Sequence, residues 1–160
     1  MANLGVLYAK GNGVAQDYAE ARKWYEKAAA AGDINGMANI GYLYRDGNGV
    51  PKDPAEARKW FEKAAAAGHA ASMTSLGFLY ETGNGVPKDY AEARKWYEKA
   101  AAAGHANGMA NLGFLYLNGR GISKDTAEAR KWLSKAAAAG FENARLALQK
   151  LDSATPGTQR

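Results

Sequence analysis

The sequence contains no cysteine, two histidines and four prolines in 160 residues. The absence of cysteine excludes a disulfide framework, a thiolate zinc site and a cysteine nucleophile. No run of apolar residues exceeds four, as in the alanines 28–31, so no transmembrane span is expected. Met1 is not followed by a basic segment and an apolar stretch, so no signal peptide is expected either. The sequence assigns no compartment.

What the sequence does contain is a repeat of 36 residues. The tryptophans 24, 60, 96 and 132 follow that period, and 19 of its 36 positions are identical in all four units: 1–36, 37–72, 73–108 and 109–144. Four recurring positions account for sixteen of the 19 glycines. Glycine therefore marks fixed points of a repeated fold, and the chain is predicted to form one repeat domain over 1–152.

Each unit predicts two helices. In the second unit, apolar residues at helical spacing indicate a first helix, helix A, over 34–46, and Gly47 suits its left-handed end. Asp53, Pro54 and Glu56 are typical of the start of a second helix, helix B, with a capping-box-like pattern. Helix B is expected to run to Ala67. Because such a hairpin cannot bury its apolar faces alone, the units must stack, with the tryptophans in the core.

These residues resemble the Sel-1-like repeat, a relative of the tetratricopeptide repeat. The resemblance implies an all-α fold: a right-handed α/α superhelical solenoid of four 36-residue helix-turn-helix repeats with a C-terminal capping helix over 141–152. It also implies an adaptor or scaffold that binds a protein or peptide, without catalysis or a cofactor, in a groove lined by the helix A faces. In the second unit the family pattern comprises Ala38, Gly41, Tyr44, Gly47, Gly49, Val50, Asp53, Ala55, Ala57, Trp60, Lys63, Ala64, Ala65 and Gly68.

The residues predict the same face independently. At 100° per residue, positions 35, 38, 42, 45 and 46 lie opposite the core residues of helix A, and most of them vary between units. Fifteen residues are therefore predicted to line the concave, partner-binding face: Asn35, Ala38, Asn39, Tyr42, Arg45, Asp46, Thr74, Phe78, Glu81, Thr82, Asn107, Asn111, Phe114, Leu117 and Asn118.

Within this set, the aromatic residues Tyr42, Phe78 and Phe114 are expected to form an exposed ladder, one ring per repeat. The alternative is that they pack against the next helix A. Asn39 and Asn111, with Asn3, either bind a partner backbone or form a ladder between helices. Arg45, Asp46 and Glu81 either set charge specificity or are simply solvated.

The formal charge of +5, from 21 basic and 16 acidic residues, does not predict nucleic-acid binding. The units carry 0, +1, 0 and +2 and the remainder +2, and basic and acidic residues alternate on helix B, as in Arg58 and Glu62. A nucleic-acid surface needs a concentrated basic stripe.

No catalytic or metal site is predicted. His69 and His105 occupy equivalent positions in successive units, and the expected spacing of packed helices, about 8–10 Å, is too wide for one zinc ion. We expect them instead to cap the next helix A, where Asp33 stands in the first unit. The protein is predicted not to be an enzyme.

The two ends differ from the units. The first helix lacks an N-cap, and the exposed face near Leu4 and Leu7 predicts end-to-end self-association. Residues 153–160 are expected to be a disordered tail. The abrupt start indicates a fragment of a longer array or an engineered protein. Two further hypotheses therefore stay open, an engineered or structural array without a specific ligand and a hydrolase.

Overall fold

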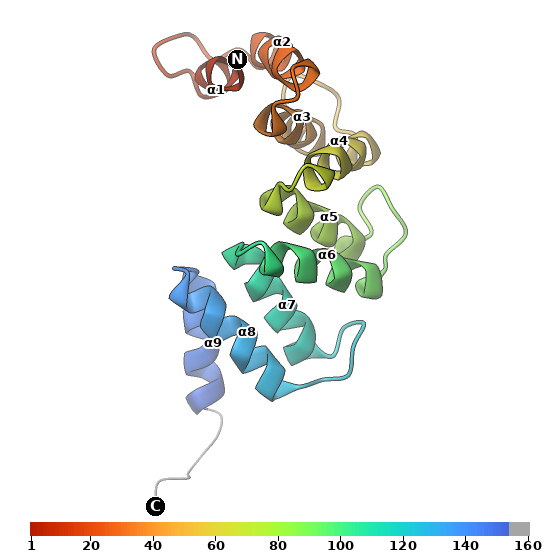
Figure 1. Cartoon of the computed structure of the whole chain (residues 1–160), viewed down its shortest axis with the longest axis vertical. Coiled ribbons are helices and arrows are strands. Elements are labelled where there is room, and N and C mark those ends of the chain that lie inside the picture. Colours follow the sequence, from red (N-terminus) through yellow and green to blue (C-terminus); the bar gives the residue numbers. More distant parts are fainter. Residues whose placement is uncertain (154–160) are drawn as a thin grey trace, which may run out of the picture.

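The chain folds into helices joined by short turns. The computed structural model describes residues 1–153, and over that range the secondary structure is nine α-helices and no strand. Figure 1 shows them stacked in chain order along a crescent. The helices are α1 (Ala2–Lys10), α2 (Tyr18–Ala30), α3 (Ile34–Asp46), α4 (Pro54–Ala66), α5 (Ala70–Thr82), α6 (Tyr90–Ala102), α7 (Ala106–Asn118), α8 (Thr126–Ala138) and α9 (Glu142–Ser153).

The prediction of two helices per unit is confirmed. Odd-numbered helices are helix A and even-numbered ones helix B. Helix B ends one residue before the predicted end, at Ala66, and α9 starts and ends one residue later than the predicted capping helix. Ser153, predicted to begin the tail, is therefore helical, and the rest of that segment, 154–160, lies outside the described residues.

Local sequence signals set these boundaries. Asp53 accepts a hydrogen bond from the Glu56 backbone N–H at 2.9 Å, and the other helix B starts are capped by aspartate in the same way. Glu56 does not complete a capping box, because its carboxylate pairs with Lys59 at 2.7 Å. The Asp53 N–H instead donates to the Tyr44 carbonyl at 2.8 Å, which ties the link to helix A.

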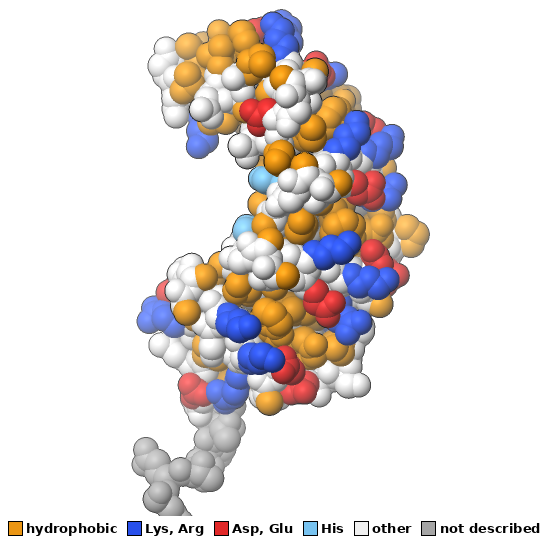
Figure 2. Space-filling view, in the orientation of Figure 1, with side chains coloured by type: hydrophobic (Ala, Val, Ile, Leu, Met, Phe, Trp, Pro, Cys, Tyr) orange, Lys and Arg blue, Asp and Glu red, His pale blue; other side chains and the backbone are white. Residues whose placement is uncertain are grey.

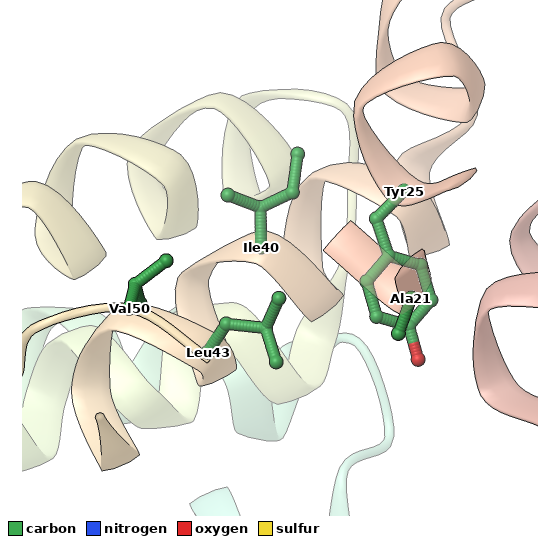
Figure 3. Packing of buried hydrophobic residues seen from close by; sticks show 5 residues of the cluster. All are labelled: Ala21, Tyr25, Ile40, Leu43 and Val50. Atoms are coloured by element: carbon green, nitrogen blue, oxygen red, sulfur yellow. The ribbon is translucent and has the colours of Figure 1, made fainter. Parts of the chain in front are cut away.

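The core is a row of clusters, each shared by two repeats. Figure 3 shows the first, in which Ala21 and Tyr25 of α2 lie beside Ile40 and Leu43 of α3, with Val50 from the next link. Equivalent clusters join α4 to α5 and α6 to α7. Because every cluster draws helix B from one unit and helix A from the next, each interface requires both neighbouring units.

Close contact within a repeat depends on the helix A glycine. A Cβ at Gly41 would lie 2.6 Å from Cε1 of Phe61, a fully buried ring of α4. The tryptophans, expected in the core, are only partly buried. Each has the ammonium of the lysine three residues later above its ring, at 4.1–4.5 Å from the ring centre. They cover the clusters from outside and hold a cation against the surface.

Charge is distributed unevenly over the crescent. The space-filling view in Figure 2 shows basic and acidic side chains mixed along the outer edge and a hollow on the inner edge, where the histidines lie. The predicted pair of Arg58 and Glu62 is present at 3.1 Å. These outer pairs are exposed and contribute little to stability.

Candidate functional site: a groove along the helix A face

Two adjoining hollows lie along the helix A side of the crescent. The first has a volume of about 390 Å³ and lies between α3, α5 and α7, and the second, of about 660 Å³, lies between α7 and α9. Asn111 and Phe141 line both hollows, so the two form one groove. The concave helix A face therefore offers a continuous recess across several repeats.

The groove collects nine of the fifteen predicted residues. The first hollow is lined by Tyr42, Arg45, Thr74, Phe78, Asn107 and Asn111, and the second by Asn111, Phe114, Leu117 and Asn118. The sequence reasoning missed the remaining lining residues: Ala71, Ser75, His105, Phe141, Asn143, Leu146, Ala147, Lys150 and Leu151. His105 and Phe141 occupy one position that differs among the units, as Asp33, His69, His105 and Phe141, and that variation is the signal that could have identified them.

Six predicted residues do not line either hollow. Asn35 and Asp46 are exposed, Asn39 is half-buried, and the Thr82 hydroxyl donates to the Phe78 carbonyl at 2.8 Å. The expectation that Ala38 lies on an open face is wrong, because it is buried. Its equivalent Ala110 lies in one cluster with Ala144 of α9. This position therefore faces the next helix A, which an angle count on a single helix cannot reveal.

Glu81, the sixth, turns into a polar network outside the groove. The Tyr97 hydroxyl donates to its Oε2 at 2.8 Å, and Arg120 donates to its Oε1 at 3.3 Å. Burial and the Glu81 charge together raise the pKa of Tyr97. Glu81 therefore accepts a hydrogen bond from the buried Tyr97 side chain. Neither of its predicted roles, charge specificity or simple solvation, describes these contacts.

Of the three aromatic residues expected to form an exposed ladder, only Phe78 is exposed, and Tyr42 and Phe114 are partly buried. The Tyr42 ring meets the Phe61 ring edge-on at 5.1 Å, and the Arg45 guanidinium lies 4.8 Å from the Tyr42 ring centre. Phe114 packs against the cluster that joins α8 and α9. Phe78 is 49% exposed. Its ring is therefore the one most open to the groove among these three residues.

The cations of the groove are Arg45 and Lys150, one in each hollow. Arg45 donates to both carboxylate oxygens of Asp46, at 2.7 and 2.8 Å, which raises the pKa of the guanidinium. Among the described residues, no aspartate or glutamate lines either hollow. The lining residues therefore carry two positive formal charges and no negative one, and Asp46, outside the lining, pairs with Arg45.

The histidines act differently from each other. As predicted, His69 caps α5: its Nδ1 accepts the Ser72 N–H at 3.2 Å. His105 precedes α7 but makes no side-chain cap, and its Nδ1 lies 2.8 Å from Oγ1 of Thr74 on α5. The Thr74 hydroxyl donates to the Ala70 carbonyl, so we infer that the His105 Nδ1–H donates to Thr74.

Both imidazoles are held towards the neutral form. Burial lowers the pKa of His69, and burial together with the charge of His69 lowers that of His105. Within residues 1–153 there is no group of three His, Asp or Glu placed to hold a metal ion. No helix in that range is both long and apolar enough to cross a membrane.

Comparison with known proteins identifies the repeat. The model of the Sel1 repeat matches four successive segments, 1–33, 34–69, 70–105 and 106–141. The chain belongs to the Sel1 repeat family. The second, third and fourth Sel1 segments begin at the first residues of α3, α5 and α7, three residues before the unit boundaries taken from the sequence. Sel1 repeat proteins are generally non-catalytic scaffolds for protein interactions.

Solved Sel1 structures share this arrangement. A Sel1 repeat protein from Oxalobacter formigenes is 40% identical with a TM-score of 0.88, and covers 93% of this chain and 61% of its own. The protective antigen c5321 of uropathogenic Escherichia coli is 39% identical with a TM-score of 0.83, over 87% of this chain and 30% of its own. Helicobacter pylori cysteine rich protein B is 26% identical with a TM-score of 0.64, over 81% and 92%. The chain thus spans 61% and 30% of the first two relatives. The search of curated proteins gave no match.

Proposed function

We propose that the chain is a non-catalytic scaffold that binds an extended segment of a partner protein in the helix A groove. The observation that carries this proposal is the continuous recess shared by α3, α5, α7 and α9, with Phe78 exposed inside it. A half-exposed phenylalanine in a concave site is costly in water and suits a contact residue.

The polar lining supports an extended ligand. Asn107, Asn118 and Asn143 lie along the groove and are exposed. A side-chain amide presents both donors and an acceptor, the set needed to bind a peptide backbone. Apolar side chains between them provide places for alternate side chains of a partner.

The test is selection from a displayed library of random peptides about 12 residues long, which span about 40 Å when extended. Selected peptides are then measured by fluorescence anisotropy against the wild type and Phe78→Ala. Loss of an interface aromatic commonly costs about 2 kcal/mol, so we expect an affinity about thirtyfold lower.

Val14→Ala is the matched control, because Val14 is an exposed apolar residue, 37% accessible, outside both hollows. It should leave affinity unchanged. Thermal melts of both variants establish that folding is intact. The proposal is wrong if selected peptides bind Phe78→Ala as tightly as the wild type, or lose affinity equally in both variants.

A further inference from the structure

We propose that the partner segment is acidic as well as apolar: it places bulky apolar side chains in the second hollow and carboxylates near Arg45 and Lys150. This inference rests on the proposed function and names the chemistry of its ligand. Its basis is the distribution of charge inside the groove, which differs from that of the outer face.

The groove holds formal charge of one sign. Arg45 lines the first hollow and Lys150 the second, and no carboxylate lines either within residues 1–153. Carboxylates are plentiful elsewhere, but they cap helix B or pair with lysine and arginine along it. A ligand inside the recess therefore meets Lys150, which has no carboxylate partner, and Arg45, whose charge Asp46 offsets in part.

Both cations keep donors for a ligand. Arg45 uses Nε and one Nη2 hydrogen for Asp46, and Asp46 lies outside the lining. The Nη1 hydrogens remain, in the planar geometry that suits a second carboxylate. The Lys150 ammonium has no carboxylate partner within residues 1–153.

The second hollow combines apolar side chains with asparagines. Phe114, Leu117, Phe141 and Leu146 surround the second hollow, and Leu146 is 44% exposed. Arg45 lines only the first hollow and Lys150 only the second, and the two hollows share Asn111 and Phe141. An extended segment that combines bulky apolar residues with carboxylates matches this lining.

Nucleic acid also carries negative charge, but the groove fits it poorly. Phosphate backbones need several closely spaced cations, whereas only two line this groove, one in each hollow, and one of them already has an acidic partner. The favoured ligand is therefore an acidic, apolar peptide, and single-stranded nucleic acid becomes an arm of the test.

The experiment uses the display library above, encoding acidic and basic residues at equal frequency. Peptides that require Phe78 are expected to be enriched in Asp and Glu. Their affinity should fall about tenfold in Lys150→Glu and fall again as NaCl is raised from about 50 mM to about 300 mM. Lys95→Glu is the matched control, because it makes the same change of net charge at a side chain of α6 that is 59% exposed and lines neither hollow. It should change affinity less than about twofold.

The outcomes separate the two proposals. If peptides require Phe78 but show no acidic enrichment and bind Lys150→Glu normally, the acidic ligand is wrong and the groove function stands. If no peptide requires Phe78, the groove function itself fails. If a fluorescein-labelled oligothymidylate of the same length binds more tightly than the acidic peptides, the ligand class is wrong.

Discussion

The residue that precedes helix A differs between repeats, but its backbone carbonyl makes the same kind of hydrogen bond in each of α3, α5, α7 and α9. The carbonyls of Asp33, His69, His105 and Phe141 each accept an N–H from the first turn of the next helix. The side chains differ: Asp33 and His69 cap, His105 reaches back to α5, and Phe141 forms part of the groove wall. Since the backbone already starts the helix, this side chain is free to take on a local role.

The His69 cap should make the protein sensitive to mild acid. Burial lowers the folded-state pKa of His69 below its ordinary value, so its stabilising contribution is full above about pH 6.5 and is lost as the pH falls. Protonated Nδ1 cannot accept the Ser72 N–H, and an imidazolium at a helix N-terminus opposes the helix dipole. The melting temperature should therefore fall from about pH 7.5 to about pH 5, and fall less in His69→Asn, which retains a cap without titrating.

Circular dichroism melts of the wild type, His69→Asn and His105→Asn at both pH values test this. The pKa of His105 is lowered as well, so His105→Asn should also reduce the acid response, but only His69→Asn removes the part that comes from a cap. A larger reduction in His105→Asn than in His69→Asn would show that the response does not come from the cap.

At the scale of the helix, one pair of residues sets how closely helix A approaches helix B. The pair is glycine against a large side chain: Gly41 with Phe61 in the second unit and Gly113 with Leu133 in the fourth. A Cβ at Gly41 would lie 2.6 Å from Cε1 of Phe61, and one at Gly113 would lie 2.9 Å from Cγ of Leu133. The repeat thus tolerates different side chains on helix B because helix A presents none.

The difference between these pairs predicts unequal costs. Gly41→Ala and Gly113→Ala gain the same helix propensity, about 1 kcal/mol, so comparison of the two isolates the steric term. We expect Gly41→Ala to be less stable by about 1 kcal/mol, because the rigid, buried Phe61 ring yields less than the Leu133 side chain. Urea unfolding of both variants measures the difference. Equal free energies of unfolding would mean that the two interfaces relax equally well.

The helices could be predicted from the sequence because their signals are local. Asp53 and Gly47 fix helix ends through bonds within a few residues, and the repeat shows which signals recur. The face lining the groove required knowledge of neighbours. Ala38 is buried and Phe114 is packed by the next repeat, whereas Lys150 and Leu146 enter the groove from α9, whose sequence departs from the repeat. Positions on one helix do not determine what the adjacent helix covers.

At the scale of the whole molecule, stability depends on neighbours rather than on a central core. Each hydrophobic cluster joins adjacent repeats, so an inner helix is packed on both sides along the stack. In this chain α1 buries Ala2 and Gly5 and α9 buries Ala144, whereas α7 buries five residues. In such a linear array the ends should open before the middle.

Hydrogen exchange followed by mass spectrometry should therefore show a gradient. Amides of α1 and α9 are expected to exchange at least about tenfold faster than those of α5 and α7, since local opening costs less where fewer apolar contacts are lost. Uniform protection across the helices would instead indicate one cooperative unit.

Because α9 supplies Leu146 and Lys150 to the groove, an acidic peptide selected on the wild type should slow exchange in α9 and leave α1 unchanged. Slowing of both ends alike would indicate general stabilisation of the array, since α1 contributes no residue to either hollow.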